Sequence, residues 1–155
     1  MAGALAVAAL NLVAGVLGAW VWSRGVATIA EGSTDGRTHA FWVLLRVGQG
    51  SALAFAVAVG SLAAAGHSSS ERLFYLYALL PLAVAFVAEQ LRIASAQTIL
   101  DQRGLADAAA VGELAESEQH ELVAAIVRRE VGVMAMSALV VVFLALRAAG
   151  TAHGF

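Results

Sequence analysis

Apolar residues along this 155-residue chain fall into four long stretches that are separated by polar segments. We place them at about residues 3–23, 41–65, 72–103 and 118–148. An α-helix needs roughly 20 apolar residues to cross a hydrocarbon core about 30 Å thick, and each stretch is long enough to do so. The pattern therefore predicts an all-α integral membrane four-helix bundle, with residues 1–155 forming a single transmembrane domain.

The polar segments between the stretches predict two sizeable loops. Residues 24–40 are rich in glycine and charge and are expected to form the first loop. Residues 104–117 form the other, and within it the Ala-rich run 105–111 fits either a short helix or a plain loop. The connection between the second and third helices, around His67, is expected to be short.

Local signals indicate where the later helices begin and bend. Ser68 and Glu71 have the S-x-x-E spacing of a capping box at the start of the third helix. Ser117 is the expected N-cap of the fourth helix. Pro81 lacks a backbone N–H and crowds the preceding turn, so a kink is expected in the third helix.

The third and fourth helices are predicted to be longer than the bilayer is thick. Helical periodicity continues through the polar stretch 89–103, and an apolar stripe at 122–127 precedes the membrane part of the fourth helix. Each helix would be on the order of 45 to 50 Å long, against about 30 Å for the hydrocarbon core. We expect an antiparallel hairpin that extends beyond the bilayer, or helices that tilt steeply within it.

Composition supports a lipid environment and excludes several chemistries. The chain is 61% hydrophobic with a mean hydropathy of +0.82. It contains no cysteine, which excludes disulfides, thiolate metal sites and cysteine nucleophiles. The net charge is −2 and no basic–aromatic run occurs, so nucleic acid is not an expected partner.

The arginines predict which side of the membrane each loop faces. All nine basic residues are arginine, a bias that suggests a bacterial, GC-rich coding background. Only Arg72 and Arg147 lie near the second loop and the termini. The remaining seven flank the first and third loops: Arg24, Arg37, Arg46, Arg92, Arg103, Arg128 and Arg129. The positive-inside rule then places both termini outside and loops one and three in the cytoplasm, with the chain in the bacterial inner membrane.

A layer of polar residues at one membrane boundary is the main candidate site. It is expected to combine residues of the second, third and fourth helices: Arg46, Gln49, Glu89, Gln90, Arg92, Arg128, Arg129 and Glu130. Charges in lipid cost several kcal/mol by some estimates, so these side chains should face inward or snorkel, and Arg46, Arg92 or Arg129 can neutralise Glu89. The layer fits either structural ion pairing or the lining of a transport path.

A second set of residues suits close helix association. Asn11 is the one strongly polar residue deep in the first helix, and it is expected to form a hydrogen bond across a helix interface. Small residues allow close backbone approach within the chain or between copies of it, at Gly15, Gly18, Gly48 and Gly60.

No motif in the sequence points to catalysis, a metal or a cofactor. The histidines are His39, His67, His120 and His153; all lie outside the predicted spans, so paired haem ligation inside the bundle is not expected. The leading hypothesis is a non-enzymatic membrane protein that acts through helix association, as a homo-oligomer or as a subunit of a partner membrane protein. The alternatives are a small transporter or channel and an anionic-lipid-binding protein.

Overall fold

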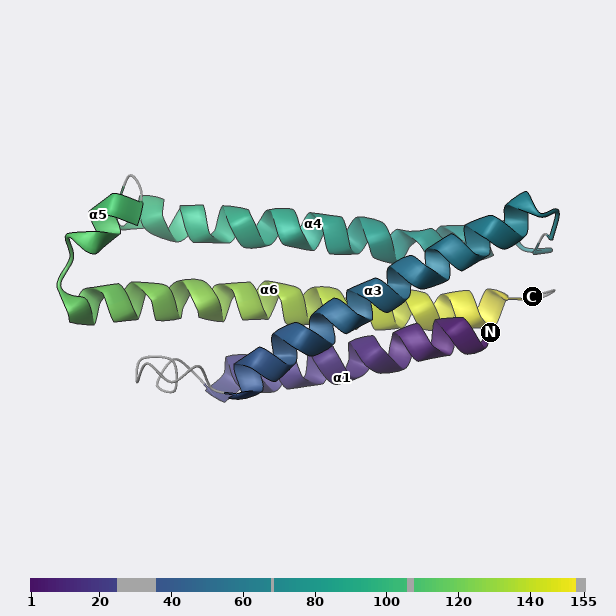
Figure 1. Cartoon of the computed structure of the whole chain (residues 1–155), viewed down its shortest axis with the longest axis horizontal. Helices are drawn as coiled ribbons and strands as arrows, with labels where there is room; N and C mark the ends of the chain where they lie inside the picture. The colour runs from purple at the N-terminus through teal and green to yellow at the C-terminus, as the bar shows by residue number, and fades with distance from the viewer. Residues whose placement is uncertain (25–35, 68, 106–107, 153–155) are drawn as a thin grey trace.

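In the computed structural model, the described residues are 1–24, 36–67, 69–105 and 108–152, and among them all regular structure is helical. The elements are α1 (Ala2–Arg24), α3 (Gly36–Ala64), α4 (Arg72–Gln102), α5 (Ala108–Gly112) and α6 (Glu116–Thr151). Figure 1 shows four long helices and one short helical turn. The predicted all-helical class is confirmed.

Four helices are long and apolar enough to cross a membrane: α1, α3, α4 and α6. Their lengths are 23, 29, 31 and 36 residues, so α6 alone extends about 54 Å at ~1.5 Å per residue. The chain is therefore treated as a multi-pass membrane protein with four spans, as the apolar pattern predicted.

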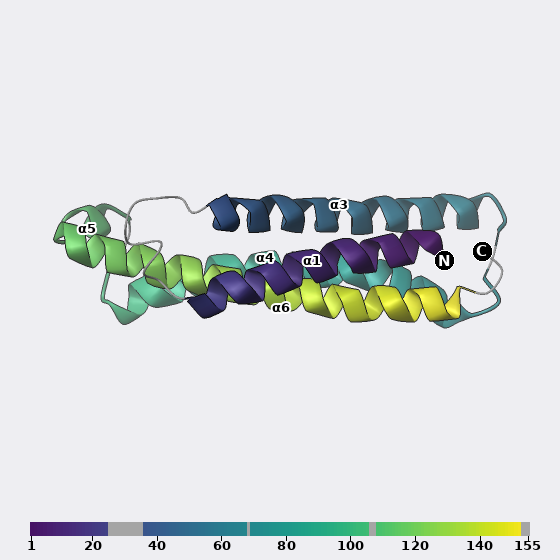
Figure 2. The same ribbon diagram turned by 90° about the horizontal axis from the view of Figure 1, so that it is seen from below.

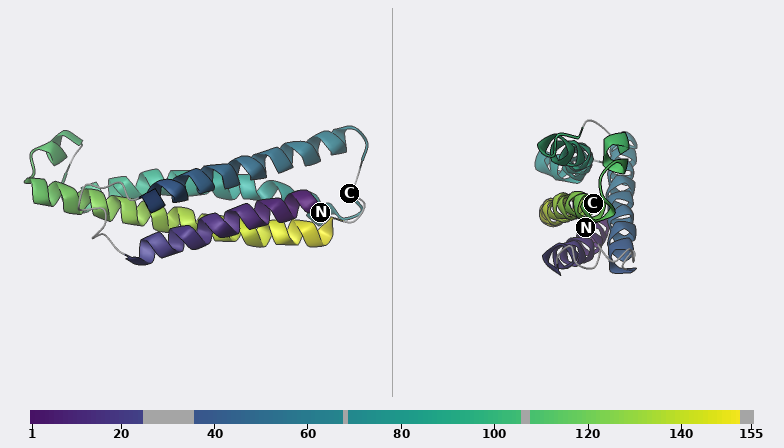
Figure 3. Two further views of the ribbon diagram at one scale, coloured as in Figure 1. Left: turned by 60° about the horizontal axis from the view of Figure 1, so that its bottom comes forward. Right: turned by 90° about the vertical axis from the view of Figure 1, so that its left-hand side faces the viewer.

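Helix α6 lies between α1 and α4, and α3 crosses the other three on one side (Figures 1 and 2). The view along the long axis shows α4, α6 and α1 in a row, with α3 running across them (Figure 3). The start of α1 and the end of α6 lie at the same end of the molecule (Figure 1). Each contact between the long helices is thus antiparallel except where α3 crosses obliquely.

Helices α4 and α6 continue past the Arg24 end of α1, and α5 lies at the corner that joins them (Figure 1). We call this projecting part the stalk; it comprises α5, residues 93–102 of α4 and residues 116–127 of α6. The short helix α5 resolves the choice between helix and loop for the Ala-rich run. The rest of this connection contains the turn that reverses the chain.

Buried positions in α1 recur every three or four residues, which gives that helix one face toward the others. Ala4, Val7, Ala8, Asn11, Ala14, Gly15 and Gly18 lie on this face. Most are small, so the backbones of α1 and α6 approach closely. Large apolar side chains elsewhere remain outside; Val16, Val57 and Phe143 are 57%, 58% and 64% exposed. An outer surface of this kind is suited to lipid rather than water.

Helix α3 begins at Gly36, five residues before the predicted start of the second span. Residues 36–40 were expected to belong to the loop, and that part of the prediction is wrong. The first turn is held by Arg37, whose guanidinium carbon lies 4.7 Å from the centre of the Trp20 ring on α1. This contact joins two helices, so no local pattern in residues 36–40 could reveal it.

Helix α4 begins at Arg72, and Glu71 is the residue just before it. Ser68 lies outside the described residues. Glu71 cannot be the third residue of the helix, as the proposed capping box requires, so that prediction is wrong. Instead, the Ser69 hydroxyl accepts a hydrogen bond from the Glu71 N–H at 3.2 Å. The helix then continues without interruption through the buried Pro81.

Two glycines end the helices that precede the turns. Gly66 and Gly104 have φ angles of +87° and +69°, a region that glycine adopts without strain. After each of them, the next N–H bonds to a carbonyl five residues back, from His67 to Leu62 and from Leu105 to Leu100, both at 3.0 Å. This arrangement is a Schellman motif, and it explains why α4 ends just before Gly104.

Helix α6 begins earlier than predicted, because Ala115 rather than Ser117 occupies the N-cap position. The carboxylate of Glu118 accepts a hydrogen bond from the Ala115 N–H at 3.4 Å, which places Ser117 inside the first turn. The Gln119 amide donates to the carbonyl oxygens of Gly112 and Leu114, at 3.3 and 2.8 Å. These bonds tie the start of α6 to the corner of the stalk.

Candidate functional site

Charged side chains from α3, α4 and α6 meet around Glu89. One carboxylate oxygen, Oε1, accepts from the guanidinium of Arg46 on α3, and the other, Oε2, accepts from Nε of Arg92 at 3.0 Å. Arg46 also donates to Oε1 of Gln49 at 2.7 Å. Nη1 of Arg92 lies 3.9 Å from a carboxylate oxygen of Glu130 on α6. We call these five residues the ionic cluster.

The ionic cluster is only partly shielded. The side chains of Glu89, Arg92 and Glu130 are 25%, 30% and 21% exposed, and Arg46 is 52% exposed. Arginine stems can lie along apolar helices while the guanidinium reaches the polar boundary. Because every carboxylate in the cluster has a cationic partner, the arrangement neutralises itself and connects three helices at one depth.

Arginine–tryptophan contacts surround the cluster at the same end of the membrane helices. Arg24 lies 5.0 Å from the Trp20 ring centre, Arg92 lies 5.6 Å from Trp42, and Arg128 lies 5.3 Å from Trp22. Tryptophan rings favour the membrane–water boundary, where arginine side chains can reach them. The last two pairs join residues of different helices, so spacing along the chain carries no signal for them.

Comparisons with known proteins add no family to this description. No protein-family model, curated protein or solved structure matches the chain. The function proposed below rests on the chemistry and geometry of the chain itself.

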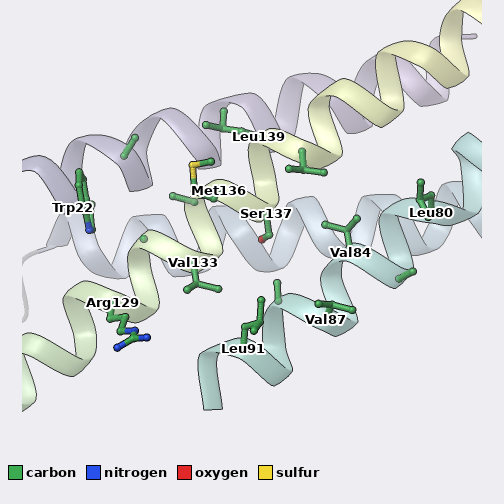
Figure 4. A pocket seen from close by; sticks show the side chains of 16 residues that line it. Trp22, Leu80, Val84, Val87, Leu91, Arg129, Val133, Met136, Ser137 and Leu139 are labelled. Carbon is green, nitrogen blue, oxygen red and sulfur yellow. The ribbon is translucent and has the colours of Figure 1, made fainter. Parts of the chain in front are cut away.

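An apolar groove lies between α4 and α6, with part of α1 at one end. It has a volume of about 900 Å³. Figure 4 shows Arg129 and Trp22 toward one end and Leu80 toward the other. We call it the α4–α6 groove; its lining residues are Ala19, Trp22, Leu80, Ala83, Val84, Val87, Ala88, Leu91, Arg129, Gly132, Val133, Ala135, Met136, Ser137, Leu139 and Val140.

The predicted polar layer divides into three parts in the structure. Arg46, Gln49, Glu89, Arg92 and Glu130 form the ionic cluster. Arg128 packs on Trp22, and Gln90 is exposed on α4 without a described polar contact. Arg129 lines the groove instead of binding Glu89, and among the described residues it forms no ion pair with a carboxylate. The sequence thus predicted which residues belong to the layer, but it did not predict that they would lie in three separate environments.

The residues predicted for helix association lie mostly inside the molecule. Asn11 is 2% exposed and donates to the carbonyl oxygens of Val7, at 2.9 Å, and Gly48, at 3.3 Å. Added Cβ atoms at Gly15 and Gly18 would meet neighbouring side chains at 2.7 and 2.5 Å, so both glycines are needed for close packing. Gly60 has open space around it and faces outward.

The histidines do not assemble into a ligand set in the part of the chain that the structure describes. His39 lies in the first turns of α3, His67 follows α3, and His120 lies in α6. His153 is outside the described residues. Within the described ranges, no three histidine, aspartate or glutamate side chains come together as metal ligands.

Proposed function

We propose that this protein is a non-enzymatic subunit of a membrane assembly and that it acts through helix association at the stalk. In this proposal the long helices form a four-helix bundle in the bacterial inner membrane, and the stalk stands in the cytoplasm with both termini outside. The seven arginines at the stalk end, against two at the other, support that orientation.

The observation that carries the proposal is the length of α4 and α6 beyond the ionic cluster. From Glu89 to Gln102 there are 13 further residues on α4, and from Glu130 back to Glu116 there are 14 on α6. At ~1.5 Å per residue each segment continues for about 20 Å. A chain that only needed to cross the bilayer would have no use for two additional helical segments of this length.

The stalk has a narrow interior and apolar side chains that remain outside it. Its buried residues include Ser95, Ile99, Leu122 and Ala124. Ile93 and Val123, in contrast, are 62% and 48% exposed. Two helices in water bury only one face each, and a further helix packed on the stalk would bury these residues too. This favours association with a second copy or with a partner membrane protein.

The tip of the stalk is strongly acidic. Exposed carboxylates gather there, from Asp101, Glu113, Glu116, Glu118 and Glu121. Some of this charge stabilises the start of α6 through the helix dipole. The excess would repel anionic lipid headgroups and attract a basic partner surface, so it suits a contact made away from the membrane.

The ion pairs of Glu89 support a structural role for the cluster over a transport path. Both oxygens of its carboxylate bind arginine, and Glu89 does not line the α4–α6 groove. A proton or ion carrier would need to exchange these partners during each cycle. A proteoliposome flux that depends on Glu89 would reverse this preference.

Cysteine cross-linking tests the association directly, because the natural chain contains no cysteine. Val123→Cys places one thiol on the exposed apolar side of the stalk. Glu121→Cys is the matched control: it is also exposed, but it lies two residues away and so about 200° around the helix. Oxidation or a short bis-maleimide is applied to native membranes, and adducts are identified by mass spectrometry.

We expect Val123→Cys to form a specific adduct, either a dimer of the chain or a complex with one partner, and Glu121→Cys to form at least severalfold less. Equal, diffuse labelling at both positions, together with a monomer in nanodiscs, would contradict the proposed function.

A further inference from the structure

The α4–α6 groove has the length of one membrane leaflet. It runs from Leu91 to Leu80 on α4 and from Arg129 to Val140 on α6, a separation of eleven positions on each helix. At ~1.5 Å per residue this is about 16 Å, close to half of a hydrocarbon core about 30 Å thick. One end therefore lies at the boundary marked by the ionic cluster, and the other lies near the middle of the membrane beside Pro81.

The walls of the groove are apolar along this length. Ala83, Val84 and Val87 form one side, and Val133 and Met136 contribute to the other. Ser137 is also in the wall, but its hydroxyl donates to the Met134 carbonyl oxygen at 2.8 Å. Its polarity is thus satisfied within α6, and the groove presents hydrocarbon to an occupant. The volume of about 900 Å³ falls within the range of ligand pockets.

One cationic side chain, that of Arg129, lies at the end of the α4–α6 groove nearest the ionic cluster. Arg129 lines the groove there, and the residues three and four positions away on α6 are all uncharged: Ala125, Ile126, Gly132 and Val133. The flanking side chains are already engaged, since Arg128 packs on Trp22 and Glu130 pairs with Arg92. Among the described residues, Arg129 has no carboxylate partner, so the positive charge at the mouth of the groove is uncompensated.

We propose that the α4–α6 groove binds one anionic phospholipid, with an acyl chain along the apolar walls and the headgroup phosphate on Arg129. The planar guanidinium can donate two parallel hydrogen bonds to phosphate oxygens. A lipid supplies both parts at the right separation, because its charge sits at the membrane boundary and its chain reaches the midplane. A net negative headgroup satisfies the free charge, whereas a zwitterionic lipid would place its own cationic amine near Arg129. This site is independent of association through the stalk.

Native mass spectrometry of the purified full chain tests the proposal. The protein is exchanged into mild detergent and supplied with equal amounts of phosphatidylglycerol and phosphatidylcholine. We expect one retained phosphatidylglycerol per chain and a preference of roughly fivefold or more over phosphatidylcholine, the effect of about one arginine at an anionic surface. Equal retention of the two lipids by the wild-type protein would overturn the proposal without any variant.

Two pairs of variants locate the site. Arg129→Gln should abolish the preference, while Arg128→Gln, which removes a neighbouring charge packed on Trp22, should retain it. Ala83→Phe should fill the groove and lower retention of both lipids, while Ala54→Phe, at an exposed position on α3 outside the groove, should not. Each variant is checked for helix content and elution volume, and if Ala83→Phe is misfolded it is replaced by Val87→Trp at the groove wall.

Unchanged preference in a folded Arg129→Gln protein would remove the phosphate assignment. A dimer that appears without lipid, and that Ala83→Phe disrupts, would show that a second copy of the chain occupies the groove instead.

Discussion

Helix α6 packs differently against its two neighbours, α1 and α4. Toward α1 it is closed: Gly15 and Gly18 admit Leu139 and Ala135, and Asn11 bonds across to α3 nearby. Toward α4 it is open along the α4–α6 groove. Small residues occur on both sides, at Gly15 and Gly18 on one and at Ala83 on the other, while Ala135 borders both.

The contrast shows that small residues do not by themselves determine how closely two membrane helices pack. Near Gly18 the space left by the missing side chain is filled by Phe41, which is completely buried. In the α4–α6 groove the Trp22 ring lies 3.1 Å from a Cβ built at Gly132, whereas Ala83 on the facing helix stays exposed. A stripe of small residues gives close packing where a bulky neighbour fills it, and a binding surface where none does.

The largest effect on stability is expected from Gly18→Ala, which adds a methyl group to the tightly packed contact between α1 and α6. The new Cβ would lie 2.5 Å from a Phe41 ring atom and 2.8 Å from the Ala135 Cβ, so backbone or ring must move. We expect the free energy of unfolding to fall by about 1–3 kcal/mol, the usual cost of overpacking. Denaturant titration followed by circular dichroism measures it. Gly60→Ala is the control, because its Cβ meets open space and its cost should be near zero.

Asn11→Leu removes the buried hydrogen bonds on the same side while keeping the number and branching of the side-chain heavy atoms. We expect a loss of about 0.6–2 kcal/mol, since interhelical hydrogen bonds in lipid contribute modestly. The same titration applies, with Leu12→Ala as the control at a position that is 47% exposed. A stability equal to wild type would show that the Asn11 contact with Gly48 is not energetically important.

A smaller effect is expected from the ionic cluster. A double-mutant cycle with Glu89→Gln and Arg46→Gln should give a coupling free energy of about 0.5–1 kcal/mol, because the pair is partly exposed. The coupling should weaken at high salt. A coupling of several kcal/mol that is insensitive to salt would indicate a desolvated pair and a more central role for Glu89.

The smallest effect concerns the corner of the stalk. Gln119→Ala removes two hydrogen bonds to the carbonyl oxygens that precede α6. Global stability should change by only about 0.5–1 kcal/mol or less. Hydrogen exchange should nevertheless speed up locally in α5 and the first turn of α6, whereas Gln97→Ala on α4 should leave both segments unchanged.

Much of this fold could be predicted because membrane spans depend on summed hydropathy. The C-terminal end of α4 followed from Gly104, where a left-handed glycine stops the helix, whereas the Ser68–Glu71 spacing misplaced its start. The start of α3 could not be predicted in the same way, because Arg37 is held by Trp20 of another helix. The local sequence pattern determines where a helix is possible, and contacts between helices determine the residue at which it begins or ends.

For the candidate site, the sequence predicted which residues take part but not how they pair. Charges at one level on three helices indicated the layer that contains Glu89 and Arg46. Which arginine binds Glu89 and which one is left at the groove depends on helix rotation, and adjacent residues such as Arg129 and Glu130 point about 100° apart. The groove itself depends on how α4 and α6 are placed relative to each other, which spacing along the sequence does not show.

The central claim is that four helices span the membrane while the stalk stands in water on the cytoplasmic side. Single cysteines in this cysteine-free chain test it most directly, at Glu118 in the stalk and Met136 in the membrane part of α6. With a membrane-impermeant maleimide, Glu118→Cys should react only after the membrane is broken, and Met136→Cys should stay unlabelled in both conditions. Labelling of Glu118→Cys on intact cells, or rapid labelling of Met136→Cys, would contradict the account.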